Sequence, residues 1–211
     1  MGEMNEGVIK YDRSNFTKSV PLEISEYQEL ENFRLPLYRT KLIGAYESGL
    51  GYGNISVRTN DKNNLKNSSP QFLITGTQTG NLEHLNGSHY TKVINFSLEN
   101  FNIETVGPIE ASSEALTHAS IYEFNLNIKA IIHIHSSSIW KGMLRDGQYP
   151  QTAASITYGT KEMAMAIKEC LKNEGQGVLV MAGHEDGVIT YGPTLEIASK
   201  LIFELYYKYQ N

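Results

Sequence analysis

Cysteine is almost absent from this sequence: Cys170 is the only one among its 211 residues. One thiol cannot form a disulfide within the chain, and such low cysteine use is typical of proteins in a reducing compartment. We therefore expect a cytoplasmic protein. The segment around Cys170, AMAIKECLK, has a helical pattern, and its thiol is either a partly buried, inert group or a nucleophile.

Long apolar runs are also missing. No stretch has the roughly 18 apolar residues that a membrane helix needs, and residues 1–19 lack the apolar core of a signal peptide. The net charge is −5, and no long run of either sign provides a basic surface for nucleic acid. The sequence therefore predicts a soluble protein without membrane or nucleic-acid partners, which binds a small molecule or another protein.

The chain is long enough, and with 40% apolar residues hydrophobic enough, for a large core. We expect an N-terminal arm over residues 1–20 and a single domain over residues 21–211. A helical pattern over residues 21–49, which Pro36 should interrupt, precedes a series of strands. A polar turn at residues 59–70 should join the first two strands into a hairpin, so we expect an antiparallel meander. The expected strands are Asn54–Arg58, Gln71–Thr75, Tyr90–Ser97 and Asn102–Val106.

Helices and strands alternate in the second half of the chain. Ser112 or Ser113 and then Thr160 are suitable helix caps, and Pro193 fits the first position of a last helix, with its apolar face toward the core. The expected helices cover residues 112–124, 136–144, 161–172 and the segment from Pro193 onward. The expected strands are Lys129–His135, Gly177–Met181 and Gly187–Tyr191. This mixture predicts an α/β fold.

Three histidines occur where expected strands end. His133 and His135 are alternate residues of one strand, so their side chains point to the same face, ~6.6 Å apart along the chain. His184 lies in the turn between the last two strands. Three imidazoles match the ligand type and number of an open zinc site, in which the fourth position is left for substrate or water. The alternative is that these histidines are hydrogen-bonded polar residues at the edge of the sheet.

Glu114 stands at the start of the helix expected over residues 112–124. The helix N-terminus lowers the pKa of such a carboxyl and burial raises it, so Glu114 is a candidate acid or base; the alternative is a carboxylate that only interacts with the helix dipole. His118 shares its helical face and either orients it or packs in the core. Glycine- and hydroxyl-rich segments at 51–56, 75–80 and 111–113 can surround a phosphate or carboxylate with backbone N–H groups.

Six motifs together resemble the class II aldolase/adducin family, which includes zinc-dependent aldolases and epimerases of sugar phosphates. They occur in the family's order between about Tyr38 and Tyr207. The motifs are GNISVR (53–58), ITGTQTG (74–80), SSEALTH (112–118), HIH (133–135), YGTKEM (158–163) and GHEDGVITYG (183–192). The resemblance implies a single three-layer α/β/α domain around a mostly antiparallel sheet, and a homotetramer with active sites near subunit interfaces.

The resemblance also implies roles for individual residues. His133, His135 and His184 would bind Zn²⁺ or another divalent metal, and Glu114 would be the acid/base. The residues that would hold a substrate phosphate are Asn54, Thr79, Gly80, Ser112 and Ser113. The implied enzyme is a lyase of carbohydrate metabolism. It would cleave or form an aldol bond in a small hydroxy-carbonyl substrate, with or without a phosphate, through an enediolate.

Two departures from the aldolase pattern affect these roles. Gly51 stands where the sugar-phosphate aldolases have a hydroxyl residue, three positions before the asparagine of GNIS, so one phosphate contact is missing. The third histidine of the aldolases directly precedes a glycine, whereas here Glu185 and Asp186 follow His184.

A third departure is the segment between His135 and Gly159, which is shorter than in the aldolases. It should carry a tyrosine that serves a neighbouring subunit's site, and Tyr149 and Tyr158 are the tyrosines nearby. An epimerase, dehydratase or decarboxylase with the same zinc site therefore stays open, as does a non-catalytic scaffold like the adducin head domains. A hydrolase that uses one of Ser136–Ser138 would lack the usual GxSxG turn.

Overall fold

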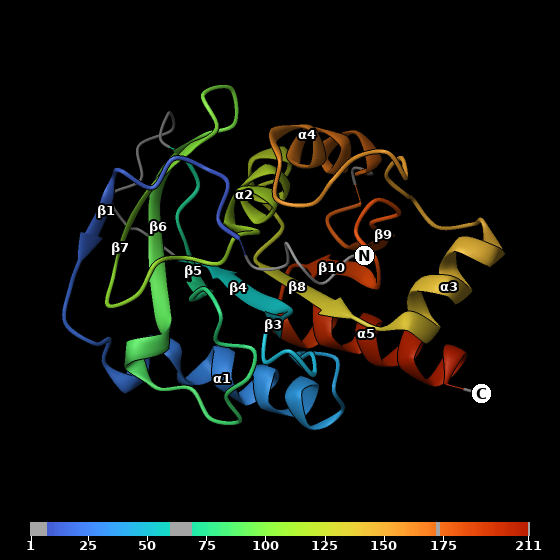
Figure 1. Ribbon diagram of the computed structural model, residues 1–211, viewed down its shortest axis with the longest axis horizontal. Helices are drawn as coiled ribbons and strands as arrows, with labels where there is room; N and C mark the ends of the chain where they lie inside the picture. The colour runs from blue at the N-terminus through green and yellow to red at the C-terminus, as the bar shows by residue number, and fades with distance from the viewer. Residues whose placement is uncertain (1–7, 60–68, 172–173, 211) are drawn as a thin grey trace.

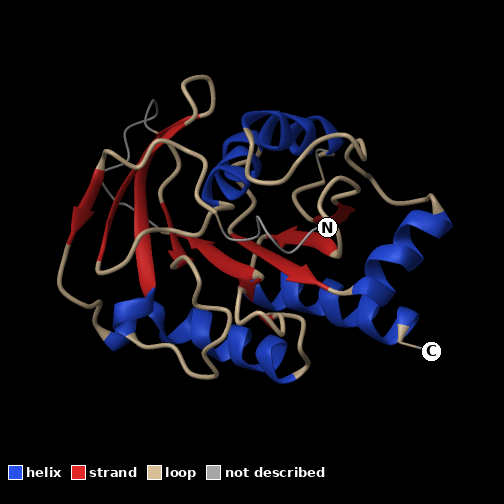
Figure 2. Ribbon diagram, in the orientation of Figure 1, coloured by secondary structure: helices blue, strands red, loops and turns tan. Residues whose placement is uncertain are grey.

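The computed structural model describes residues 8–59, 69–171 and 174–210. Within these ranges, a large sheet carries helices on both faces (Figures 1 and 2). In sheet order its strands are β1 (Phe16–Lys18), β7 (Asn102–Gly107), β6 (Tyr90–Ser97), β5 (Phe72–Thr75), β4 (Asn54–Arg58), β8 (Ala130–His135), β10 (Gly187–Gly192) and β9 (Gly177–Val180). All neighbouring strands of this sheet are antiparallel except β1 and β7, which are parallel.

Two layers of helices cover the sheet. One face packs against α2 (Ala115–Phe124) and α4 (Lys161–Cys170). The other packs against α1 (Ile24–Arg39), α3 (Ser137–Asp146) and α5 (Leu195–Tyr209). The predicted α/β/α architecture around a mostly antiparallel sheet is confirmed.

The central strand β8 reads AIIHIH, and all its residues are buried. A strand with few polar positions fits here because both faces of the sheet are covered. Ile131 packs with α2 and α4, whereas Ile132 and Ile134 pack with α1, α3 and α5. Since side chains alternate along a strand, His133 and His135 lie on the same face as Ile131.

The first helix is shorter than predicted. The pattern over residues 21–49 suggested a long helix interrupted at Pro36, but α1 continues through Pro36 and ends soon after it. Lys41 has a φ of 59°, a left-handed conformation that cannot continue the helix. The chain then forms a small antiparallel hairpin of β2 (Gly44–Ala45) and β3 (Gly51–Tyr52).

The last helix begins at Leu195, two residues later than expected. Pro193 is not its first residue, because Thr194 is the N-cap and its Oγ1 accepts a hydrogen bond from Ile197 N at 3.2 Å. Such a cap stabilises a helix by about 1 kcal/mol, so the hydroxyl and not the proline ring sets the helix start. The predicted core-facing residues of this helix are buried: Leu195, Ala198, Ile202 and Leu205.

Arg34 and Glu31 form a buried ion pair within α1, and a hydrogen bond from Tyr90 of β6 connects this pair to the sheet. Arg34 is 1% exposed, and its guanidinium donates to both carboxylate oxygens of Glu31 at 2.6 and 2.8 Å and to carbonyls of residues 82–83. Glu31 also accepts hydrogen bonds from Leu85 N at 3.0 Å and Tyr90 Oη at 2.8 Å. Burial raises the pKa of Glu31, but these hydrogen bonds outweigh it and lower the pKa below its ordinary value.

Two predicted features lie partly outside the described residues. These are residues 1–7 of the arm and residues 60–68 of the turn at 59–70. The rest of the arm includes β1, and β4 and β5 pair as expected for a hairpin. No helix in the described ranges has the length and apolar character needed to cross a membrane.

Candidate metal centre

The sheet register brings the three predicted histidines together. On β8, His133 pairs with Asn54 of β4, and His135 pairs with Gly187 of β10. The turn that precedes β10 therefore lies beside the end of β8. Asp186 in this turn has a φ of 66°, and Gly187 N donates to His184 O at 2.9 Å. This tight turn places His184 against the other two rings.

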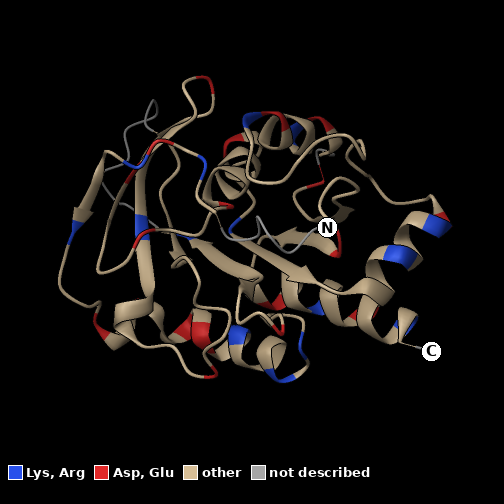
Figure 3. Ribbon diagram, viewed as in Figure 1, with Lys and Arg blue, Asp and Glu red and all other residues tan. Residues whose placement is uncertain are grey.

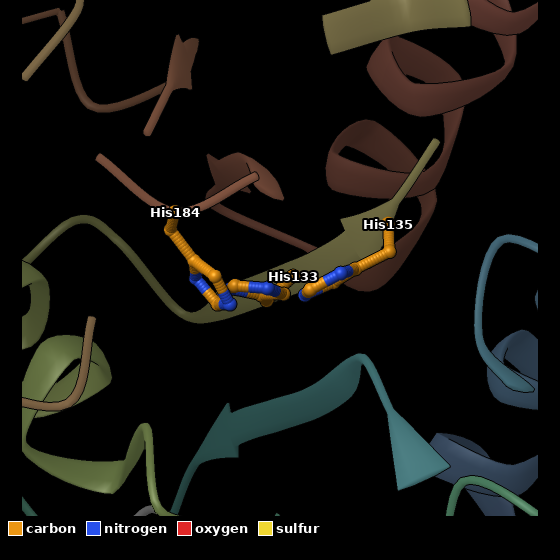
Figure 4. A group of neighbouring side chains, drawn as sticks. All are labelled: His133, His135 and His184. Carbon is orange, nitrogen blue, oxygen red and sulfur yellow. The ribbon is translucent and has the colours of Figure 1, made fainter. Parts of the chain in front are cut away.

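The three imidazoles point toward one another (Figure 4). Their ring centroids are 4.6 to 5.1 Å apart, and each ring offers one nitrogen within 4.8 Å of the other two. All three side chains are buried. Three such nitrogens match the ligand type and number of an open zinc site.

The environment of His133 and His135 favours their neutral imidazoles. Burial, followed by the neighbouring histidines, holds the pKa of His133 well below its ordinary value, and burial and His184 do the same for the pKa of His135. Both acidic and basic residues lie along the outer helices α4 and α5 (Figure 3). A neutral imidazole is the form that binds a metal.

His133 provides the test of whether a metal fits. It is 1% exposed, and neither of its ring nitrogens has a hydrogen-bond partner within the described part of the chain. Leaving a buried polar group unsatisfied costs about 1–3 kcal/mol, so such a group calls for an explanation. A metal ion coordinated by one of its nitrogens supplies one, and the residues present fit such an ion.

Glu114 lies at the start of α2, as predicted, and is 2% exposed. It is itself the N-cap residue, so the cap expected at Ser112 or Ser113 was wrong; Ser112 Oγ instead accepts a hydrogen bond from Glu114 N at 3.3 Å. Thr117 Oγ1 donates to Glu114 Oε2 at 2.8 Å. The other oxygen, Oε1, is 3.6 Å from the position that a Cβ would take on Gly159.

Of the two tyrosines considered for the site, Tyr158 is the one beside it. Its ring stacks on His184 with centroids 4.6 Å apart, whereas Tyr149 contacts Lys208 on α5. Lys10 from the N-terminal arm also contacts Tyr158. Its Nζ lies 4.0 Å from the ring centroid and donates a hydrogen bond to the Tyr158 carbonyl oxygen at 2.7 Å.

The five predicted phosphate-binding residues line one recess together with Glu114 and Gln78. Its free volume is about 20 Å³, which is room for about one water molecule. Gln78 has a left-handed φ of 58°, and its Oε1 accepts a hydrogen bond from Gly51 N at 3.0 Å. A Cβ on Gly51 would lie 3.0 Å from Gly80 N, so a side chain here would require the backbone of Gly80 to shift by a few tenths of an ångström.

A larger cavity of about 540 Å³ has His135 in its wall. Its walls carry hydroxyl, charged and aromatic groups, among them Lys41, Tyr46, Tyr52, Ser136–Ser138, Asp186 and Tyr206. Burial, then the neighbouring Glu185, raises the pKa of Asp186. Two of the lining residues, Lys41 and Asp186, have a positive φ, a conformation that is concentrated at functional sites.

A sequence model of the family described as "Class II Aldolase and Adducin N-terminal domain" matches residues 47–210. The chain belongs to this family. A search of curated proteins finds no significant match.

Solved structures of class II aldolase-like proteins share the fold. YgbL from Klebsiella pneumoniae, a proposed aldolase, epimerase or decarboxylase, has 20% identity and a TM-score of 0.65, with 88% of this chain and 87% of that chain covered. The L-fuculose-1-phosphate aldolase from Thermus thermophilus has 22% identity and a TM-score of 0.63, with 89% and 92% covered. A sugar-phosphate aldolase from Thermotoga maritima has 20% identity and a TM-score of 0.62, with 86% and 90% covered.

Several residues around the three histidines were not found from the sequence. Lys10 carried no signal, because an isolated lysine on an arm is ordinary. Tyr46 and Tyr52 were assigned to the tail of a helix and to a glycine-rich break, although both contact His135. Their aromatic character in a glycine-rich segment was the one available signal.

Proposed function

We propose that the protein is a metal-dependent, lyase-type enzyme that cleaves or forms an aldol bond in a small hydroxy-carbonyl substrate. The observation that carries this proposal is the cluster of three buried imidazoles, in which His133 has no hydrogen-bond partner among the described residues. Class II aldolases typically depend on a divalent metal, and this donor set suits Zn²⁺.

His133, His135 and His184 would hold the ion. When bound, a divalent ion supplies Lewis-acid stabilisation of charge that develops on the substrate's carbonyl oxygen, worth several kcal/mol. We assign different parts of the substrate to the histidines and to the two recesses. Its reacting carbons would lie near the histidines, and the ≈540 Å³ cavity has room for the rest of the molecule.

Glu114 is assigned the proton transfer at the carbon next to the carbonyl. In aldol cleavage the hydroxyl on the next carbon gives up its proton and becomes the aldehyde carbonyl of the leaving fragment, while the carbon–carbon bond breaks and its electron pair forms the enediolate. A proton must then be returned to the carbon next to the original carbonyl. Thr117 holds Oε2 of Glu114, so we assign the proton to Oε1, on the side of Gly159. A positioned acid/base of this kind contributes a factor of about 10² to 10⁴ in rate.

The recess formed by Asn54, Thr79, Gly80, Ser112 and Ser113 would receive an anionic or hydroxylated end of the substrate. Because its free volume is about 20 Å³, Gln78 must move before a phosphate can enter. The variant Gln78→Ala should therefore lower the KM for dihydroxyacetone phosphate, with little change for dihydroxyacetone. Equal effects on both compounds would argue against a phosphate site in this recess.

The small recess also favours a second candidate. An epimerase, dehydratase or decarboxylase would use the same three histidines and Glu114 on a substrate without a phosphate. A non-catalytic, adducin-like scaffold is disfavoured because all four of these side chains are present. We further propose a homotetramer in the cytoplasm, acting in carbohydrate metabolism; light scattering on the purified protein tests the tetramer.

Elemental analysis of protein produced with zinc available tests the metal centre. Wild type should carry stoichiometric metal, and His133→Gln should lose it. His118→Gln is the matched control, because His118 is equally buried but its Nδ1 bonds to Ser56 Oγ at 2.7 Å, outside the cluster. Wild-type protein without divalent metal would overturn the proposal.

Exchange of the carbon-bound protons of dihydroxyacetone phosphate and dihydroxyacetone in D₂O, followed by NMR, tests the chemistry. Metal-loaded wild type should accelerate exchange in at least one of them. A metal-loaded protein that exchanges neither compound and cleaves no L-fuculose 1-phosphate would support the scaffold alternative.

A further inference from the structure

Two tyrosines of one hairpin hold His135 in different ways. The hydroxyl of Tyr46, in the loop between β2 and β3, lies 2.7 Å from His135 Nδ1. Tyr52, in β3, stacks its ring on the imidazole, with centroids 5.4 Å apart and planes 29° apart. The hydroxyl of Tyr52 points elsewhere and donates to Lys41 O at 3.3 Å. Tyr46 thus contacts His135 through its hydroxyl as well as the edge of its ring, whereas Tyr52 does so through its ring alone.

The hairpin fixes both tyrosines. Tyr46 N donates to Leu50 O at 3.0 Å, and Gly49 N donates to Tyr46 O at 2.9 Å, which closes the loop. Tyr52 lies over Gly44, where a Cβ would be 2.7 Å from its hydroxyl oxygen. The two rings also contact each other, with centroids 4.8 Å apart. The Tyr46 hydroxyl is therefore positioned by backbone structure and by aromatic packing.

This hydrogen bond selects the ring nitrogen that faces the cluster. Because Nδ1 is directed at Tyr46, Nε2 is the His135 nitrogen that can coordinate an ion. Coordination uses the lone pair of Nε2, so the proton of the neutral ring must be on Nδ1, where it donates to the Tyr46 oxygen. Metal-ligating histidines usually have such a partner for the second nitrogen, and its removal typically weakens metal binding about 10- to 100-fold.

We propose that Tyr46 is a positioning residue of the metal centre, which fixes the tautomer and the ring orientation of His135. This inference rests on the metal centre of the proposed function. A phenol oxygen is a neutral acceptor, so it orients the ring while polarising it less than a carboxylate would. Tyr52 packs against the same ring but has no part in setting its tautomer.

The test compares Tyr46→Phe with Tyr52→Phe. Each variant removes one hydroxyl and keeps the aromatic ring, and both rings contact His135. Zn²⁺ affinity is measured by competition with a chromophoric chelator, and the visible spectrum of the Co²⁺-loaded protein reports ligand geometry. We expect Tyr46→Phe to bind Zn²⁺ about 10- to 100-fold more weakly with an altered Co²⁺ spectrum. We expect Tyr52→Phe to match wild type in both measurements.

Two further measurements separate positioning from folding. Metal-free Tyr46→Phe should unfold at a somewhat lower temperature than metal-free wild type, because the buried Nδ1 of His135 loses its partner, but it should remain folded under the conditions of the binding measurement. In a His135→Gln background, Tyr46→Phe should cause no additional loss of Zn²⁺ affinity, because the hydrogen bond is already gone. If Tyr46→Phe binds Zn²⁺ as wild type does, or Tyr52→Phe weakens binding equally, the role of Tyr46 is overturned and the metal centre stands. Wild type without Zn²⁺ affinity would overturn both proposals.

Discussion

Two groups of buried polar side chains in this protein differ in how they are satisfied. Around Arg34 and Glu31, the guanidinium, the carboxylate, a tyrosine hydroxyl and backbone groups form hydrogen bonds with one another. His133 is equally buried, but both of its ring nitrogens lack a partner among the described residues. A satisfied buried network stabilises its own fold, whereas an unsatisfied one lowers stability until a ligand binds. We call Arg34 and Glu31 the structural group, and we propose that His133 belongs with His135 and His184 to a functional cluster.

The largest expected effect is on catalysis, and it concerns Glu114, the proposed acid/base. Glu114→Gln should reduce the turnover of metal-loaded enzyme about 10²- to 10⁴-fold, because a positioned proton carrier is lost. Its metal content and free energy of unfolding should change little, since the amide keeps the shape of the carboxyl group. Proton exchange in dihydroxyacetone phosphate and urea denaturation measure these quantities. A variant with wild-type exchange would remove Glu114 from the mechanism.

The next largest effect is on stability, and it concerns the structural group, Arg34 and Glu31. Arg34→Met should lower the free energy of unfolding by about 3–5 kcal/mol, because it leaves the Glu31 carboxylate buried without its cation. Urea denaturation of the metal-free protein provides the measurement. The double variant Glu31→Leu/Arg34→Met is the control and should recover most of the loss, since no buried charge remains. A loss no larger than that of an exposed ion pair would show that water reaches this network.

For His133, in contrast to Arg34, we expect a substitution to cost little stability in the metal-free protein. His133→Leu in the metal-free protein should change the free energy of unfolding by no more than about 1 kcal/mol, or raise it, because the variant removes an unsatisfied polar group. Added Zn²⁺ should then stabilise wild type by about 2.7 kcal/mol at a hundredfold excess over Kd, but not the variant. Denaturation with and without Zn²⁺ measures both. A large loss in the metal-free variant would mean that His133 stabilises the fold directly.

The sequence predicted the strands well because their patterns are local. NISVR alternates, YTKVINFS is rich in β-branched and aromatic residues, and AIIHIH is apolar except for its two histidines; these runs form β4, β6 and β8 within a residue or two of the expected bounds. The alternation also put His133 and His135 on one face. The contact of His184 with them depends on the pairing of β8 with β10, which the residue pattern alone did not predict; the family resemblance implied only that the three histidines share one site.

What the sequence missed depends on short or non-local structure. The β2 and β3 strands have two residues each, too few for a periodic pattern, so Tyr46 and Tyr52 were assigned to neighbouring segments. The left-handed backbone of Lys41, which ends α1, has no signal in residue type. The small volume of the Gln78 recess follows from side-chain packing across three segments, which a motif does not specify.

The smallest expected effect is a pH dependence confined to the structural group. Hydrogen bonds from Arg34, Leu85 and Tyr90 outweigh burial and hold the pKa of Glu31 below 4.5, its ordinary value. The folded state therefore binds the proton less tightly than the unfolded state, so the stabilisation is complete above pH 4.5 and is lost as the pH falls through the lower, folded value. In metal-free protein, the difference in free energy of unfolding between wild type and Glu31→Gln should be constant above about pH 5.5 and shrink below pH 4.5. Since His133 is present in both proteins, its protonation cancels in this difference. A difference that grows toward acid pH would mean that burial outweighs the hydrogen bonds at Glu31. The Glu31 carboxylate would then be an incompletely satisfied buried group, as His133 is.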